Sequence, residues 1–387
     1  MDDSFGAGGQ VRTSLMQYNE IYAAALQPDG KIVVAGSTSD RDSDTLFGLV
    51  RYLPDGQLDT SFGEEGKVLT KAAPAETRSD LPRLAIPYFL TLQEDGSIVV
   101  GGLQEIGGED YSTRLIILRY TPDGRLDTSF AKNGIFGLDT GLNSRAHDAV
   151  LLTDGKLVVA GEQADSALFL RLTPEGTLDP DFGTNGVVTF GASDAAKRII
   201  LTSEQRYLVA TTNRIVRFNR DGTQDVSFEN PSLNNTNGFD IGLQTDGKII
   251  VGSSEEIFRN SSLAPQRSIP PQPDIVVRRF DEDGNLDTDF GSEGKAITKV
   301  NGAGFLKKLV VQADDKIIIT GANALTLRLN ENGTLEASSI GAFESAYGLM
   351  PTSENAILIA GYDESSNGRD YALAKFLPEA APADKPR

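Results

Sequence analysis

The sequence contains no cysteine and only one histidine among its 387 residues. The absence of cysteine excludes disulfides, thiolate zinc sites, iron–sulfur clusters and cysteine nucleophiles. The single histidine, His147, excludes metal sites that need several imidazole ligands and is the only candidate for a histidine base. The functions that remain are those that depend on neither thiol chemistry nor a multi-histidine metal centre.

Positive charge is also scarce, because 36 lysine and arginine residues face 55 aspartate and glutamate residues, for a formal net charge of −19. Such a surface repels nucleic acid and anionic membranes at neutral pH. No apolar run reaches the roughly 18 residues that span a bilayer, and no basic-then-apolar signal segment opens the chain. We therefore expect no nucleic-acid partner and no membrane insertion. The compartment stays undetermined, although the lack of cysteine favours a secreted or cell-surface protein.

What the chain has in abundance is a repeated phrase. The segment LVRYLPDGQLDTSFGEEGKV from Leu49 returns in similar form from Ile117 and Val276, and a truncated copy, MDDSFGAGGQV, begins at Met1. The first half of each repeat resembles ALQPDGKIVVAG from Ala25. Two β-rich runs joined by Asp-Gly predict a hairpin. Because the KIVVAG runs are apolar on both faces, we expect these strands to be covered on both sides.

The second half of each repeat predicts two further strands around a tight turn. The segment Pro54–Gly56 suits a three-residue turn. DTSFG then predicts one helical turn, capped by Asp59 and ended by Gly63 in the left-handed conformation. The phenylalanine of this motif, Phe62 in the first copy, is expected in the core, and a fourth strand follows.

An arginine stands eight residues before the capping aspartate, and the turn between them places the two side chains opposite each other. One interpretation is a ring of cations for an anionic ligand. The other, which we favour because the motif recurs in every unit, is a structural ion pair in each blade. The expected pairs are Arg51–Asp59, Arg119–Asp127, Arg171–Asp179, Arg217–Asp225 and Arg279–Asp287.

Seven units occupy residues 1–378, and residues 379–387 form a C-terminal tail. The seventh unit stops after YALAKFLPEA, and its missing portion is the opening segment 1–11, in which Asp2 and Phe5 take the places of Asp59 and Phe62. A ring requires such a split, since the N-terminal strand then completes the last blade and removes two sheet edges. The sequence predicts a single all-β domain, a seven-bladed β-propeller of four-stranded antiparallel blades closed in this way.

The motif PDGxLDxSFGxxG resembles the delta-60 repeat family, and the resemblance extends from Asp2 to about Pro378. It implies a bacterial β-propeller of a kind often found in surface or exported proteins, and it supplies no shared set of catalytic residues. Two units depart from the pattern. The fourth lacks Asp-Gly at Glu204–Arg206, and the sixth has LEASSIG from Leu335 in place of LDTSFG.

Variation in loop length points to one face of the ring. Both Asp-Gly turns of a blade should lie on the same face, and the other connections, which are longer and irregular, should lie on the opposite face. A Pro-rich insert at 255–275 is among them, and it suits a lid, a partner epitope or a disordered segment. Irregular loops on a rigid scaffold carry function. The candidate ligand-binding residues there are Tyr111, Arg145, His147, Tyr347 and Tyr362.

Metal and catalytic motifs are weaker. Asp281, Asp283 and Asp287 resemble the end of a calcium loop, but the matching positions of the other repeats do not form a carboxylate cage, so a turn with a cap is favoured. The segment NSRAHD from Asn143 lacks the spacing of a nucleophile elbow. We therefore expect no resident cofactor and assign no catalytic residue.

These observations favour a non-catalytic, monomeric binding module that takes a protein or glycan on the long-loop face. The alternative is a glycan-active lyase or hydrolase with its site in the upper cleft or channel mouth, which needs several polar groups converging on one point. A third interpretation is a structural spacer in a surface assembly, which needs lateral contacts and no ligand.

Overall fold

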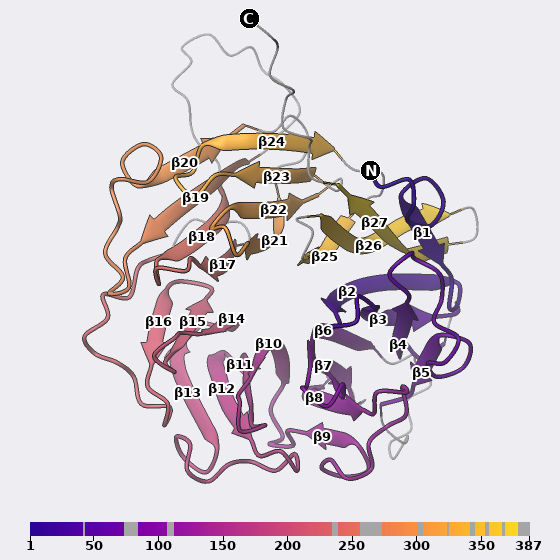
Figure 1. Cartoon of the computed structure of the whole chain (residues 1–387). Helices are drawn as coiled ribbons and strands as arrows, with labels where there is room; N and C mark the ends of the chain where they lie inside the picture. The colour runs from indigo at the N-terminus through magenta and orange to yellow at the C-terminus, as the bar shows by residue number, and fades with distance from the viewer. Residues whose placement is uncertain are drawn as a thin grey trace, which may run out of the picture.

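The protein consists of β-strands arranged in seven sheets around an axis (Figure 1). In the computed structural model, the residues described are 1–41, 43–72, 84–106, 112–233, 239–255, 273–299, 305–322, 325–340, 345–352, 356–365 and 368–377. Each innermost strand contacts the innermost strands of both neighbouring sheets, so the circle is complete. Within the described part of the chain there is no apolar helix of membrane-spanning length.

Each sheet forms one blade, numbered here along the chain. Blade 1 contains β2 (Tyr18–Leu26), β3 (Ile32–Ser39), β4 (Leu46–Tyr52) and β5 (Lys67–Thr70). Blade 2 contains β6 (Ala85–Leu92), β7 (Ile98–Glu105), β8 (Thr113–Tyr120) and β9 (Ile135–Gly137). Blade 3 contains β10 (Ser144–Leu151), β11 (Leu157–Gln163), β12 (Ser166–Leu172) and β13 (Val187–Ala192). Blade 4 contains β14 (Ala196–Leu201), β15 (Tyr207–Thr211) and β16 (Ile215–Phe218).

The remaining blades follow the same order. Blade 5 contains β17 (Phe239–Leu243), β18 (Ile249–Glu255), β19 (Asp274–Phe280) and β20 (Lys295–Thr298). Blade 6 contains β21 (Leu306–Val311), β22 (Ile317–Gly321), β23 (Leu325–Leu329) and β24 (Leu335–Ile340). Blade 7 contains β25 (Ser345–Pro351), β26 (Ile357–Ser365), β27 (Gly368–Phe376) and β1 (Gln10–Thr13).

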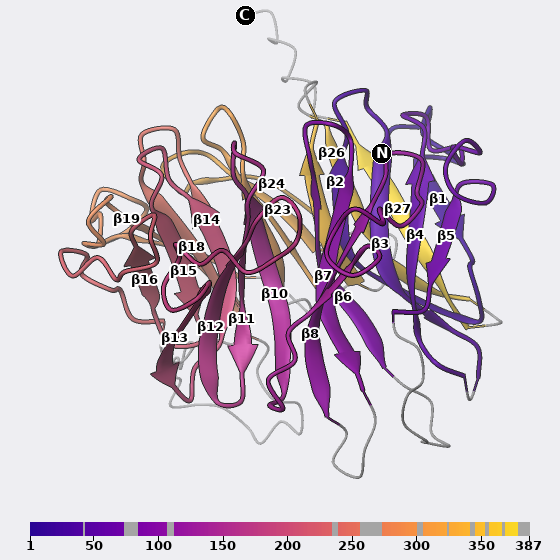
Figure 2. The ribbon, with the colours of Figure 1, turned by 90° about the horizontal axis from the view of Figure 1, so that it is seen from below.

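The antiparallel strands run between the two faces of the ring (Figure 2). In blade 1 the connections from β2 to β3 and from β4 to β5 therefore share one face, which we call the short-turn face. The connection from β3 to β4 and the link to the next blade lie on the opposite, long-loop face. In every blade the innermost strand starts at the long-loop face, so its first residues lie near that mouth of the axis.

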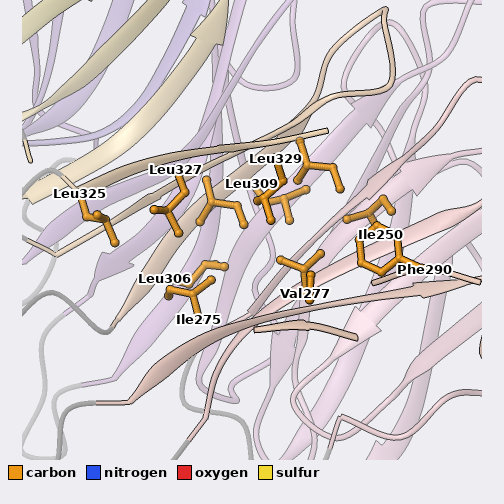
Figure 3. Close-up of a cluster of buried hydrophobic side chains, with 12 residues drawn as sticks. Ile250, Ile275, Val277, Phe290, Leu306, Leu309, Leu325, Leu327 and Leu329 are labelled. Carbon is orange, nitrogen blue, oxygen red and sulfur yellow. The ribbon is translucent and has the colours of Figure 1, made fainter. Parts of the chain in front are cut away.

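The hydrophobic core lies between blades rather than at the centre of the ring. The buried apolar side chains of the described residues form seven clusters, one for each pair of neighbouring blades. Figure 3 shows the cluster between blades 5 and 6, where Ile250 and Val277 face Leu309 and Leu327. This arrangement explains the doubly apolar strands, since β3 is packed on both of its faces by neighbouring blades and is buried from Ile32 to Thr38.

In several blades, the DTSFG segment or its equivalent contacts the turn that matches PDG in the next blade and holds the two blades together. The Phe62 ring packs beneath the turn of blade 2, where a Cβ on Gly124 would lie 2.8 Å from the ring. The φ of Gly124 is +90°, so both its backbone conformation and the close approach of Phe62 require glycine. The amide of Gly63 donates to the carbonyl of Asp123 at 2.8 Å. These contacts explain why PDG and DTSFG recur together.

The same contacts join the two ends of the chain. β1 pairs with β27 in antiparallel register, with Val11 opposite Leu373. Phe5 is buried and lies under Gly56 of blade 1, and the amide of Gly6 donates to the carbonyl of Asp55 at 2.8 Å. The opening segment of the chain is therefore both the outer strand of blade 7 and its fastening to blade 1.

Blade 4 differs from the expected four strands. Among the residues that the structure describes, which exclude 234–238, its sheet contains β14, β15 and β16 only. The fourth repeat continues after Phe228 as ENPSLNN and lacks the GxxGxV pattern that precedes the outer strand of blades 1 and 3. A single bridge between Arg214 and Ser232, and a hydrogen bond from the Ile215 amide to the Pro231 carbonyl, occupy part of the place of that strand.

Candidate functional site

The repeated arginines project from the third strand of their blades and are engaged inside the protein. Arg51 Nε donates to Asp59 Oδ2 at 2.8 Å, and its Nη1 donates to the Pro122 carbonyl of the next blade. Its guanidinium lies 4.5 Å from the centre of the Phe62 ring. The other pairs have N–O distances of 2.7 to 2.8 Å: Arg119–Asp127, Arg171–Asp179, Arg217–Asp225 and Arg279–Asp287. Because these donors are taken up internally, the arginines present little charge to a ligand.

The calcium-like segment forms a turn. Asp281 accepts hydrogen bonds from the amides of Asp283 and Asn285, at 3.0 and 2.8 Å. Asp287 is occupied by Arg279. Over the residues that the structure describes, no group of three or more acidic or histidine side chains is arranged to hold a metal ion.

A different repeated position lies on the axis. The innermost strand of six blades contains a β-bulge, in which one residue has no partner on the second strand. A bulge bends the strand and redirects the side chain of the extra residue. Blade 5 has no bulge, and Phe239 takes the matching place at the start of β17. We call these seven residues the axial ring: Tyr22, Tyr88, His147, Lys197, Phe239, Lys307 and Tyr347.

Members of the axial ring touch one another across blade boundaries. The ring centres of Tyr22 and Tyr347 are 5.7 Å apart, and those of Tyr22 and Tyr88 are 6.1 Å apart. Tyr88 lies 5.4 Å from the imidazole of His147. On the other side, Lys307 Nζ lies 5.0 Å from the centre of the Tyr347 ring. These contacts form an unbroken arc from Lys307 in blade 6 through Tyr347, Tyr22 and Tyr88 to His147 in blade 3, which we call the aromatic arc.

His147 joins this arc to a group of charged side chains. Lys197 Nζ lies 2.9 Å from His147 Nε2 and donates to Glu162 Oε2 at 3.1 Å. Arg145 Nε lies 2.7 Å from Glu162 Oε1. Burial lowers the pKa of His147, which favours a neutral imidazole at pH 7. Burial alone would raise the pKa of Glu162, but its hydrogen bond to His147 and the charge of Lys197 lower that pKa to about 2.

Tyr362 and two charged residues extend the arc. The rings of Tyr362 and Tyr347 are stacked, with centres 6.3 Å apart and planes 23° apart. The Arg369 guanidinium lies 4.9 Å from the Tyr362 ring and also binds the carboxylate of Glu20. The Tyr22 hydroxyl donates to the same carboxylate, and burial raises the pKa of Tyr22 to about 12, so this phenol keeps its proton.

The residue that follows the axial ring in each strand forms a second level. In blades 3 to 6 this level is charged, and Asp148, Arg198, Asp240 and Lys308 alternate in sign. Arg198 binds both carboxylates, at 3.0 Å from Asp148. Each carboxylate also accepts a backbone amide of the next blade, since Asp148 accepts from Ile199 at 3.0 Å and Asp240 accepts from Leu309 at 2.8 Å. This level is balanced in charge and links blades 3 to 6.

The structure brings together four of the five residues expected to bind a ligand. Arg145, His147, Tyr347 and Tyr362 all belong to the arc, whereas Tyr111 lies outside the described residues, as do residues 256–272 of the Pro-rich insert. The sequence analysis missed Tyr22, Tyr88, Lys197 and Lys307. Their spacing in the sequence could have identified them. Every member of the axial ring stands eight residues before the last residue of the four-residue hairpin turn that follows it, as Tyr22 does before Gly30.

An open pocket away from the axis is a weaker candidate. It has a volume of about 440 Å³ and is lined by Asp194, Arg214 and Asn230 among other residues. No member of the axial ring lines it. Because it lies where blade 4 lacks its outer strand, the irregular backbone of that blade accounts for it.

Comparison with known proteins agrees with this architecture. Residues 27–62, 93–130, 152–182 and 198–228 match the family model described as "Domain of unknown function (DUF5122) beta-propeller". The first three matches begin at the hairpin turn of blades 1, 2 and 3 and end at the buried phenylalanine of DTSF or its equivalent. The last match begins within β14 of blade 4 and ends at Phe228. These matches cover parts of four of the seven repeats and support a β-propeller repeat family. No curated protein sequence matches it.

Solved structures similar to this propeller have different functions. One is a catalytically inactive variant of virginiamycin B lyase from Staphylococcus aureus with quinupristin, at 15% identity and a TM-score of 0.60, covering 94% of this chain and 98% of that one. Another is the WD40 β-propeller domain of Doa1, at 12% identity and a TM-score of 0.52, covering 94% and 95%. The C-terminal WD40 domain of Sif2 has 11% identity and a TM-score of 0.50, covering 94% and 98%. These similarities establish the fold alone.

Proposed function

We propose that this propeller is a non-catalytic binding module of the delta-60 repeat type, which takes a ligand at the mouth of its axis on the long-loop face. The ligand is a glycan or a segment of a protein. The observation that carries this proposal is the axial ring, in which half-buried aromatic and cationic side chains of adjoining blades touch one another. Aromatic and basic side chains that converge in a partly desolvated place are common anchors for ligands.

The composition of the axial ring separates it from the scaffold. Scaffold positions repeat one residue type, as Arg51 and Asp59 do in most blades. The axial position varies among tyrosine, histidine, lysine and phenylalanine, yet it contains no small, aliphatic or acidic residue in any blade. Packing between blades does not require this restriction, because the blades already pack through clusters farther from the axis. Selection for a surface that faces a ligand accounts for it.

A binding role fits the acid–base groups better than the enzymatic alternative does. A glycan hydrolase needs a carboxylic acid that holds a proton near neutral pH. Glu162 has a pKa lowered to about 2 and is contacted by His147, Lys197 and Arg145, so it is a poor proton donor. Glu20 is bound by Arg369 and Tyr22. Both carboxylates are thus committed to holding neighbouring side chains in place.

The test is a screen of the intact chain against a panel of glycans and proteins, repeated with Tyr347→Ala. Loss of the contacts of this ring with Tyr22 and Tyr362 should weaken binding of any ligand at the axis by tenfold or more, roughly 1.4 kcal/mol. Leu69→Ala serves as the control, because Leu69 is exposed on the outer strand β5. Equal binding by the wild type and Tyr347→Ala would place the ligand elsewhere and reject the proposal.

A further inference from the structure

The sign of the charge on the axial ring is opposite to that of the protein. The chain carries a net charge of −19, yet the only charged members of the axial ring are Lys197 and Lys307. The level below is balanced, with Asp148 and Asp240 opposite Arg198 and Lys308. On the rim, Arg369 and Glu20 neutralise each other. Over the part of the chain that the structure describes, the axis is therefore locally positive at the level of the tyrosines.

Lys307 carries the clearest excess of positive charge. Its ammonium lies over the Tyr347 ring and 3.5 Å from the Tyr347 hydroxyl, and its side chain is half-buried. Among the described residues no carboxylate forms an ion pair with Lys307, whereas Lys308 lies 3.7 Å from Asp240 and Lys197 lies 3.1 Å from Glu162. An ammonium has three N–H donors, and partial burial without a counterion is unfavourable. This lysine is therefore suited to receive an anion.

The tyrosines beside Lys307 select for the rest of the ligand. Tyr347 stacks on Tyr362 and touches Tyr22, so three phenol rings lie together beside Lys307. A tyrosine ring has an apolar face and a polar tip. A pyranose ring matches this pattern, since its C–H bonds form an apolar face and its hydroxyl groups lie around the edge.

The backbone argues against an extended peptide at this place. A peptide that adds to a sheet needs a regular row of free backbone groups on the edge strand. The innermost strands of the blades around Lys307 and Tyr347 are interrupted by bulges near their first residues, at the level of the axial ring. A bulge disrupts the ladder locally and turns the edge away. Side-chain contacts with a compact, ring-shaped ligand are not affected by this interruption.

We infer that the axial ring binds an acidic sugar, a uronic acid residue of a glycan, with its carboxylate on Lys307 and its ring against Tyr347. The inference rests on the proposed binding function and specifies its ligand class. A single lysine suits a singly charged carboxylate. The nearby arginines, Arg145 and Arg369, are already held by Glu162 and Glu20. The ligand enters from the long-loop face, where the aromatic arc begins.

The experiment is calorimetric titration of the intact chain with an oligogalacturonate of four residues, its methyl ester and a hexaglutamate peptide. The ester has the same rings without the charge, and the peptide has the charge without the rings. We expect binding of the oligogalacturonate that weakens with added salt, binding of the ester at least tenfold weaker, and no binding of the peptide.

The variants are Lys307→Met, Lys307→Arg and, as the control, Lys132→Met, since Lys132 is exposed on the outside of blade 2. Lys307→Met should lose the preference for acid over ester, Lys307→Arg should retain it, and Lys132→Met should behave as the wild type, with the melting temperature of each variant showing that it is folded. If Lys307→Met does not fold, the comparison of acid with ester in the wild type and in Lys307→Arg still tests the inference, because Lys307→Arg should retain the preference for the acid.

The inference is overturned if the oligogalacturonate does not bind, if acid and ester bind equally, or if only the peptide binds. Binding of another ligand that depends on Tyr347 would then leave the proposed function standing, whereas ligand binding that Tyr347→Ala does not weaken would reject both.

Discussion

Lys375 Nζ lies 2.9 Å from Asp2 Oδ2, although the two residues stand near opposite ends of the chain. The pair occupies the position that Arg51 and Asp59 occupy in blade 1, with lysine in place of arginine. The hydrogen bond from Lys375 and, after it, the hydrogen bond from Ser4 lower the pKa of Asp2 to about 2. The closing blade thus uses the same connection as the blades formed from one continuous segment.

Removal of residues 1–11 should strongly destabilise the protein. The deletion removes half of β1 and the buried Phe5, and it exposes part of the edge of β27. We expect a loss of several kcal/mol, a large part of the about 5–15 kcal/mol that typically stabilises a domain. Thermal unfolding measures the effect, and a truncated chain that lacks residues 379–387 is the control of similar length. A melting temperature equal to that of the intact chain would show that the closing strand contributes little.

Arg171→Ala should lower stability by about 2 kcal/mol, because it removes a buried cation that binds both Asp179 and the Arg220 carbonyl, and leaves Asp179 with Lys156 alone. The matched control is Arg125→Ala. Arg125 lies 3.4 Å from Asp123, but 83% of its side chain is exposed, so the expected cost is only about 0–1 kcal/mol. Denaturant unfolding compares the two variants. If Arg171→Ala instead keeps its stability and loses ligand affinity, the arginines form a binding site and the structural interpretation is wrong.

Gly124→Ala tests the contact that fastens blade 1 to blade 2. An alanine Cβ would meet the Phe62 ring at 2.8 Å in a backbone conformation with φ of +90°. Gly141→Ala is the control, since Gly141 also has a positive φ, of +71°, but no atom lies within 4 Å of the new Cβ. Both changes carry the backbone cost of roughly 1 kcal/mol. The additional cost at Gly124 should be about 1–3 kcal/mol for the steric conflict. Equal melting temperatures would mean that Phe62 moves aside without cost.

Stability should fall in acid partly through Glu162. Its pKa is about 2 in the folded protein and near its ordinary value of 4.5 in the unfolded chain. The unfolded chain therefore takes up the proton first as the pH falls, so the contribution of Glu162 is complete above about pH 4.5 and is lost between there and about pH 2.

Glu162→Gln should reduce stability at pH 7 by roughly 2 kcal/mol, since a charged acceptor for Lys197 and Arg145 is lost. It should also flatten the stability curve between pH 4.5 and 2. The exposed Glu64→Gln is the control and should leave the curve unchanged. Chemical unfolding at several pH values gives both curves, and a Glu162→Gln curve parallel to that of the wild type would contradict the assignment.

Much of the fold follows from local patterns. The hairpin at Asp29–Gly30, the turn at Pro54–Gly56 and the capping by Asp59 each depend on a few adjacent residues, and Gly63 has the expected positive φ of +55°. The ring itself could be inferred from the split repeat, because only a closed arrangement pairs the segment after Met1 with the end of the chain. The pattern failed in blade 4, where irregular residues replace the motif for the outer strand.

The candidate site was predicted less completely. His147 and Tyr347 drew attention as unusual residue types, whereas Tyr22 and Lys307 did not, because each is unremarkable within its own repeat. Their contacts join strands of different blades, and no local pattern specifies which side chains meet across an axis. The bulges that redirect these residues are also invisible in the hydrophobic alternation of a single strand.

The sequence by itself determined the turns, the caps, the count of seven units and the sharing of one blade by the two ends, since these depend on short motifs and their repetition. Only the tertiary structure decided which residues form the axial ring and how their charges balance. The physical reason is that Tyr22, Tyr347 and Lys307 come together only when the blades close into a circle.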